Sequence, residues 1–171
     1  MEGEGFLAVA VADPPGAVRP AAPERDPDAP SGRRLVDLAV RGLRSMYLPA
    51  GAEFVQTTRG LPGPDGPRLV TEGTSLRYTA ICALGLGAAD DDTARSVLAG
   101  RSAADLARAA ARHAAEDDDP GAVALAAWAV AEVAGEVPAG LHAWMTSRLT
   151  SGVPVDTVAI AWMLTAATAA A

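Results

Sequence analysis

The sequence predicts an all-α protein with two layers of helices. Pro120 precedes Trp128 by eight residues, and Pro154 precedes Trp162 by the same distance, 34 positions further along the chain; each Trp follows an Ala. A repeat of this length is typical of stacked helical units, which cannot bury their apolar faces alone. Nearly all-apolar helical segments also alternate with amphipathic ones. That alternation indicates an inner layer packed on both sides and an outer layer that faces water.

The N-terminal segment has a different composition. Residues 13–32 hold many prolines and almost nothing large to bury, so we expect residues 1–32 to form a disordered Pro/Ala-rich leader. From Arg33 to Met46, apolar residues recur at spacings of three and four opposite a charged face, which predicts an amphipathic helix. The helical repeat domain is therefore expected over residues 33–171.

Between Tyr47 and Gly73 the helical period disappears. The segments Glu53–Thr58 and Arg68–Thr71 are strand-like, and they flank a stretch at 61–67 whose prolines and glycines force a turn. We expect one long loop or an irregular hairpin here. A long loop in a compact domain is often functional or disordered.

After residue 73 the sequence predicts one helix after another. Each begins with a capping residue or a proline: Thr74 or Ser75, Asp90, Ser102, Asp119 with Pro120, Pro138, and Pro154. The helix from Gly121 to Ala134 carries a single charge, at Glu132, so it must be buried on most sides. The helices that begin near Thr74, Asp119 and Pro154 are the candidates for the inner layer.

The last predicted helix runs to the terminal Ala171 with no Gly, Asn or Pro to close it. An inner helix without an outer partner would leave Ile160, Met163 and Leu164 in water. We therefore expect the domain to be incomplete at its C-terminus. Self-association through this exposed helix is one expected consequence.

Composition and charge argue against several classes of function. All fourteen basic residues are Arg, which suggests a GC-rich genome and reduces the weight of the Ala and Arg content as a functional signal. The net charge of -7 argues against nucleic-acid binding. Cys82 is the sole cysteine and lies in an apolar run, so we expect a buried hydrophobe. The sequence predicts no metal site and no cofactor.

The ends of the chain carry no targeting signal that we recognise. Residues 1–5 are acidic where a secretory signal would be basic, and the apolar stretch that follows is short. The apolar tail from Thr157 to Ala171 falls short of the roughly 20 residues that span a bilayer. We expect no membrane span and a cytoplasmic protein.

One set of polar and aromatic residues lies near the starts of the three inner helices: Glu72, Arg77 and Tyr78, then Trp128, then Asp156 and Trp162. These starts would point toward the same end of the layer. Glu72 and Asp156 would then be the catalytic carboxylates of a pocket, and the other four residues would bind the substrate. The alternative is structural, with the aromatic residues in the core and Arg77 paired with an acid.

The alternating helices, the Pro-to-Ala-Trp repeat and the segment from Glu72 to Ala80 resemble the α/α-toroid proteins. These wind inner and outer helices into a closed barrel, and they include squalene and prenyl cyclase-like proteins and six-hairpin sugar-active enzymes. The resemblance covers roughly Arg33 to Ala171 and implies a partial toroid. Sugar-active toroids place carboxylates and aromatics at the open end of the barrel. The resemblance therefore implies a glycan or glycan-precursor ligand for Glu72, Tyr78, Asp156 and Trp162.

Two other functions compete with a glycan-directed protein. The first is a noncatalytic helical-repeat scaffold that binds a peptide or protein partner on its concave face. The second is an isoprenoid cyclase-like protein, although the Asp-x-Asp-Asp acid motif and the Gln-Trp repeats of squalene-hopene cyclases are missing from this sequence. The sequence leaves open whether the chain is an enzyme at all.

Overall fold

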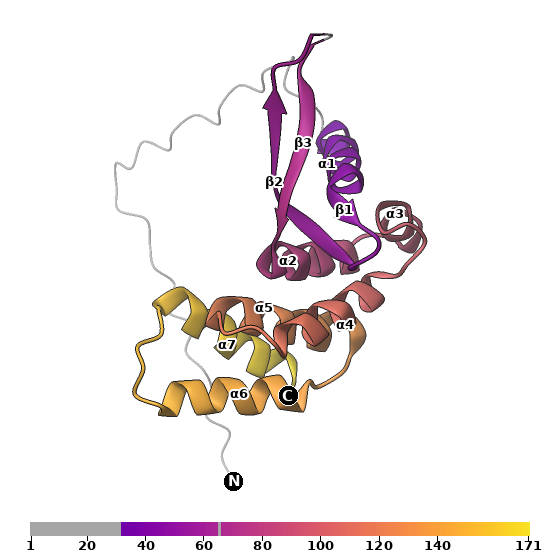
Figure 1. Ribbon diagram of the computed structural model, residues 1–171. Coiled ribbons are helices and arrows are strands. Elements are labelled where there is room, and N and C mark those ends of the chain that lie inside the picture. The colour runs from indigo at the N-terminus through magenta and orange to yellow at the C-terminus, as the bar shows by residue number, and fades with distance from the viewer. Residues whose placement is uncertain (1–31, 65) are drawn as a thin grey trace, which may run out of the picture.

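The computed structural model describes residues 32–64 and 66–171, and it is mostly helical (Figure 1). Within these residues the elements are, in order, α1 (Gly32–Met46), β1 (Tyr47–Leu48), β2 (Glu53–Leu61), β3 (Arg68–Thr74), α2 (Leu76–Gly87), α3 (Asp91–Val97), α4 (Ala103–Ala114), α5 (Pro120–Ala129), the π-helical turn η1 (Val130–Ala134), α6 (Ala139–Thr150) and α7 (Thr157–Ala169). The predicted helical character is confirmed. The chain is not entirely α-helical, because the segment expected to be a long loop or an irregular hairpin contributes strands to a small three-stranded sheet.

The sheet is antiparallel with the order β1-β2-β3, and a hairpin of β2 and β3 is its main part. Pairing in the hairpin extends from Val55 opposite Thr74 to Leu61 opposite Arg68, so a hairpin rather than an open loop occupies this segment. Both strands are longer than the predicted pieces. Their β-branched residues fit a pleated strand, which favours continued pairing toward the tip. The hairpin projects from the helical body on the same side as α1 (Figure 1).

Only the base of the hairpin is buried, and one side chain connects it to α2. Phe54 and Val55 are each 1% exposed, whereas the residues of β2 from Gln56 onward are exposed. The Thr79 hydroxyl of α2 accepts a hydrogen bond from the Phe54 N–H at 3.0 Å and donates to the Ser75 carbonyl at 2.9 Å. The Ser75 N–H in turn donates to the Phe54 carbonyl at 3.1 Å. The hairpin is therefore anchored at its base and free along its outer half.

The helix α5 is the centre of the fold. Every one of its residues from Gly121 to Ala127 is buried, and α5 packs against α2, α4, α6 and α7. The chain continues without a break into η1 and stops at Gly135, whose positive φ of 65° suits glycine at a helix end. The predicted burial of the helix from Gly121 to Ala134 is thus confirmed from Gly121 to Ala131, apart from the half-buried Trp128. Glu132, its one charged residue, is exposed.

Local capping chemistry sets the starts of the helices. Ser75, Asp90 and Ser102 accept backbone N–H groups of the first turns of α2, α3 and α4, as predicted, and Ser102 forms a complete capping box with Asp105. Asp119 caps α5 in the same way. These caps satisfy amides that have no partner within their own helix.

The start of α7 differs from the prediction. The helix begins at Thr157 rather than at Pro154, because the Asp156 carboxylate accepts the Ala159 N–H at 2.9 Å and so serves as the N-cap. Met163 is also buried, at 4% exposure, although we expected it in water. Ile160 and Leu164 are exposed as predicted.

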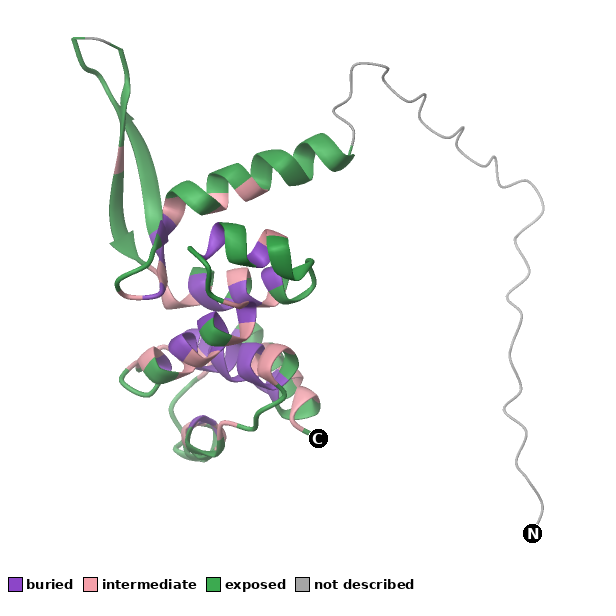
Figure 2. Ribbon diagram, turned by 90° about the vertical axis from the view of Figure 1, so that its right-hand side faces the viewer, coloured by how far each residue is buried: buried purple, intermediate pink, exposed green. Residues whose placement is uncertain are grey.

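The helix α1 is peripheral. None of its residues is buried. Its main contacts are with α3 and β2. Val40, Leu43 and Met46 in its second half pack against the core. Its first half is exposed (Figure 2), and Leu35 and Val36 there are 52% and 59% exposed. The predicted leader lies outside the described residues, except that Gly32 already belongs to α1.

Removing the Thr79 hydroxyl should loosen the attachment of the hairpin. In Thr79→Val the Phe54 N–H loses its partner in a buried setting, which should lower the free energy of unfolding by about 1–3 kcal/mol in urea denaturation. Thr150→Val is the matched control, since that hydroxyl bonds exposed carbonyls of α6, and it should change stability by less than about 0.5 kcal/mol. Equal effects of the two substitutions would contradict this role of Thr79.

Candidate functional site

Arg77 connects three helices: the N-terminal ends of α2 and α5 and the first half of α7. From the first turn of α2, its Nε–H donates to Asp119 Oδ2 at 2.7 Å and its Nη2 donates to Asp119 Oδ1 at 2.6 Å. This bidentate geometry is the strongest form of a carboxylate–guanidinium pair. The guanidinium carbon also lies 5.6 Å from the ring centroid of Trp162 in α7, within the range of a cation–π contact. The starts of α2 and α5 and the first half of α7 are thereby held together.

Gly121 makes this close approach possible, and sequence reasoning missed it. A Cβ atom at Gly121 would lie 2.9 Å from Arg77 Nη2 and 2.9 Å from Trp162 Cζ3. Contacts that short are not tolerated, so any side chain here would displace the guanidinium or the indole. The only local signal is a glycine directly after the capping pair Asp119-Pro120, and helix starts contain glycine for many reasons.

The ion pair fixes the charge of both partners. The hydrogen bonds from Arg77 lower the pKa of Asp119, against the opposing effect of burial, and the same bonds raise the pKa of Arg77. Asp119 also accepts the Gly121 N–H at 2.9 Å and so caps α5. A carboxylate held in this way stays ionised near neutral pH. It is suited to holding helices together rather than to moving protons.

The other predicted site residues have separate surroundings. Glu72 pairs with Arg59 at 2.7 Å across the exposed hairpin, and Tyr78 is 48% exposed. Trp128 lines a hollow with residues of α2 and η1, including Glu132. Of the six predicted residues, the structure brings Arg77 and Trp162 into contact, and the Asp156 charge acts on Arg77. As the structural alternative expected, Arg77 pairs with an acid.

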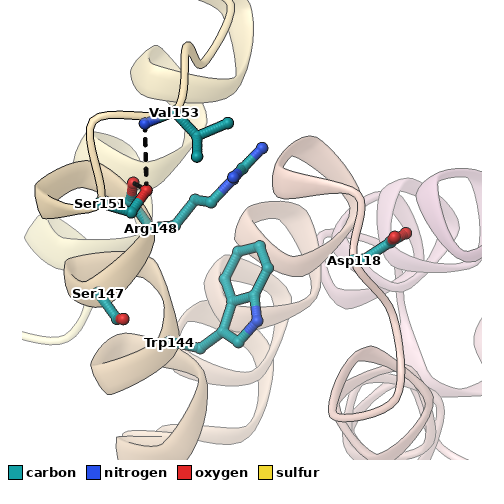
Figure 3. Close-up of a pocket in the computed structure, with 6 residues that line it drawn as sticks. All are labelled: Asp118, Trp144, Ser147, Arg148, Ser151 and Val153. Atoms are coloured by element: carbon teal, nitrogen blue, oxygen red, sulfur yellow. Dashed lines mark hydrogen bonds between the residues drawn. The ribbon is translucent and has the colours of Figure 1, made fainter.

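A cavity that sequence reasoning missed lies between α6 and the loop that connects α4 to α5. It has a volume of about 320 Å³ and is lined by Asp118, Trp144, Ser147, Arg148, Ser151 and Val153 (Figure 3). Trp144 and Arg148 are one helical turn apart on α6, so they share a face. The Arg148 Nε is buried without a hydrogen-bond partner. No sequence signal marks this cavity, because its far wall comes from a loop.

A second cavity is a groove between α6 and α7, with a volume of about 260 Å³. Its lining is apolar or uncharged apart from one histidine: His142, Met145, Thr146 and Leu149 of α6, and Ile160, Met163, Leu164 and Ala167 of α7. Leu164 is 68% exposed at the edge of the groove. The His142 Nε2 is buried without a hydrogen-bond partner.

The described residues give no support for thiol or metal chemistry. Burial raises the pKa of the Cys82 thiol to about 11, so it is protonated near neutral pH and a poor nucleophile. Among residues 32–64 and 66–171, no cluster of three or more His, Cys, Asp or Glu side chains could hold a metal ion. His113 instead contacts Glu53, with Nδ1 and Oε1 3.1 Å apart, and so connects α4 to β2.

None of the helices in the described part of the chain has the length and apolar character needed to cross a bilayer. In comparisons with protein families, curated proteins and solved structures, nothing matches this chain.

The Arg77–Asp119 pair should make the free energy of unfolding depend on pH in the acid range. The pKa of Asp119 in the folded state lies below its ordinary value of 3.8, so its charge stabilises the fold above that value, and this contribution is lost as the pH falls through the folded pKa. Asp119→Asn keeps a capping side chain but removes the ion pair. It should cost about 1 kcal/mol at pH 7, since both partners are over a third exposed.

Urea denaturation at pH 7 and at a series of pH values below 4 measures this effect. We expect the unfolding free energies of the wild type and Asp119→Asn to converge as the pH falls below 3.8. Arg77→Gln removes the same pair from the other side and should converge with the wild type over the same range. A stability difference that does not change with pH would contradict the account.

Proposed function

We propose that the chain is a noncatalytic helical-repeat scaffold that binds a protein partner through the groove between α6 and α7. In this proposal α2, α5 and α7 form the inner layer of a partial α/α toroid, and α4 and α6 form the outer layer. The packing of α5 against both α2 and α7, with α4 and α6 on its other sides, supports this arrangement. The observation that carries the binding function is the uncharged exposed face of α7.

That face is a continuous stripe. Most of the exposed residues of α7 recur at helical spacing along one side: Thr157, Ile160, Ala161, Leu164, Ala167 and Thr168. Val158 is also exposed but lies outside this stripe. On the opposite side Ala159, Met163 and Ala166 are buried in the core. The helix contains no charged residue at all. A solvent-facing helical stripe without charge is typical of an interaction surface rather than of a solvated face.

The groove beside the stripe fits another helix. Helices pack by inserting side-chain ridges of one into the grooves of its neighbour. The α6–α7 groove has a wall on each side and an apolar floor at Met145 and Met163, both 4% exposed. The unpartnered His142 Nε2 gives an incoming helix one polar group to satisfy.

We assign the groove to the α7 helix of a second copy of this chain. Each copy carries both a groove and a matching ridge formed by Ile160 and Leu164, which is the self-complementarity that a two-fold interface needs. The charge distribution also supports a second copy as the partner. A net charge of -7 makes two copies repel in general, and α7 offers a contact without like charges.

The glycan-directed reading has weaker support. It depends on Glu72 and Asp156 as paired carboxylates, and each is engaged elsewhere: Glu72 with Arg59 on the hairpin and Asp156 as the cap of α7. General acid–base chemistry needs two such groups within reach of one substrate. The isoprenoid cyclase reading lacks its acid motif in the sequence.

Sedimentation of the full chain over a range of concentrations tests the proposal. We expect a monomer–dimer equilibrium that Leu164→Arg weakens by at least about tenfold, because two like charges would face each other across the two-fold axis. Leu69→Arg is the matched control, since Leu69 is 72% exposed, close to the 68% of Leu164, but lies on the hairpin. A chain that stays monomeric at all concentrations, or a dimer that both substitutions weaken alike, would contradict the proposal.

A further inference from the structure

The apolar face of α1 is covered along only half of its length. In the second half of the helix, Val40, Leu43 and Met46 pack against the core. In the first half, Leu35 and Val36 are exposed, as the colouring of Figure 2 shows for this part of α1. Val36 precedes Leu43 by two helical turns, so both side chains belong to the same face. That face is therefore packed on the core at one end and open at the other.

The helix α1 is also a basic segment of an acidic chain. It contains four Arg and one Asp, whereas the whole chain has 14 basic and 21 acidic residues. The helical repeat places Arg34 and Arg41 on the face opposite Leu43, and it places Arg33 and Arg44 at the border between the two faces. The helix thus combines an open apolar stripe with a row of cationic side chains.

Most of this positive charge is not neutralised within the fold. Among residues 32–64 and 66–171, no ion pair involves Arg33, Arg41 or Arg44. Complementary charge steers a partner and fixes its orientation, so the segregation of charge favours an anionic partner for α1. The open stripe beside the arginines requires that the same partner also accept apolar side chains.

A lipid surface meets both requirements better than a protein groove does. A protein that takes up a basic amphipathic helix lays the apolar face of that helix into a groove. In α1 the core already occupies the second half of this face. A bilayer needs no matching groove, because it accepts apolar side chains at the boundary between headgroups and acyl chains while basic side chains stay among the headgroups.

We propose that α1 docks on the surface of an anionic phospholipid bilayer. Leu35, Val36 and Leu38 enter the boundary below the headgroups, and Arg33 at the border of the apolar face contacts lipid phosphates. With 15 residues, α1 lies along the surface rather than crossing it. Electrostatic forces decay over about 8 Å at physiological ionic strength, so acidic groups on distant parts of the chain oppose the contact only weakly.

Docking through α1 does not depend on the proposed contact through α7. Figure 1 shows α1 and the hairpin at one end of the molecule and α6 and α7 at the other. A chain that is bound to a bilayer through α1 keeps the α6–α7 groove accessible. The variant Leu164→Arg, which weakens the α7 contact, should therefore still bind anionic vesicles, so the two proposals fail separately.

Cosedimentation of the full chain with sucrose-loaded vesicles tests the proposal. We expect binding to vesicles of phosphatidylcholine and phosphatidylglycerol in equal parts. Vesicles of phosphatidylcholine alone should bind at least about tenfold more weakly, because they do not attract the arginines. Binding to the anionic vesicles should also weaken in about 1 M salt, where the Debye length falls to about 3 Å.

A double substitution tests the apolar stripe. Leu35→Gln with Val36→Gln should weaken binding to the anionic vesicles by at least about tenfold, because both side chains lose their favourable transfer from water. Val137→Gln with Val158→Gln is the matched control and should leave binding unchanged. These two residues are 59% and 54% exposed, against 52% and 59% for Leu35 and Val36, and neither belongs to α1.

A single substitution tests the charge. Arg33→Gln should weaken binding to the anionic vesicles by about fivefold, whereas Arg112→Gln, which removes an exposed arginine from α4, should not. Circular dichroism verifies that each variant keeps its helix content. The proposal is overturned if neither kind of vesicle binds, if both bind alike, or if the control variants weaken binding equally. Binding to poly-L-glutamate but not to vesicles would also overturn it, and would assign α1 to an acidic protein.

Discussion

The burial of α5 is the constraint on which the rest of the structure depends. Small residues make up most of this helix, so four other helices approach it closely. Apart from the Trp128 indole, its side chains have no polar group that would need a hydrogen-bond partner in the core. At the start of α5, Gly121 also allows close packing. Because it has no Cβ, Arg77 can contact both Asp119 and Trp162. The central helix therefore fixes both the apolar core and the ionic contact at its end.

The number of buried residues decreases in the segments that lie farther from α5. The hairpin is held to α2 through Thr79 and the buried base at Phe54, and α1 has no buried residue. Segments with few buried contacts open at a lower free energy than the core does. The groove along α7 and the cavity beside α6 both lie on helices that pack on α5 with one side and leave another side uncovered.

Capping chemistry was predictable from the sequence, and long-range packing was not. Ser75, Ser102 and Asp119 cap their helices as expected, because a cap depends on residues within one turn. A long loop or an irregular hairpin was expected where β2 and β3 form a regular hairpin, since strand pairing depends on a partner strand as much as on local composition.

The candidate site shows the same limit. Residues near the starts of α2, α5 and α7 were expected to converge, and the contact among Arg77, Asp119 and Trp162 agrees with that geometry in part. Glu72 in β3 instead pairs with Arg59, because the pairing of β3 with β2 brings the two side chains together. No pattern along α6 indicated the cavity at Arg148, whose other wall belongs to a loop thirty residues earlier in the chain, at Asp118.

Native-state hydrogen exchange, resolved by residue, tests the central place of α5 most directly. The account predicts that the amides from Val123 to Ala129 exchange only through global unfolding, with an opening free energy equal to that measured in urea. Amides in the first half of α1 and the outer half of the hairpin should exchange through local opening, orders of magnitude faster. Protection of α1 equal to that of α5, or exchange of the α5 amides through a local opening, would contradict the account.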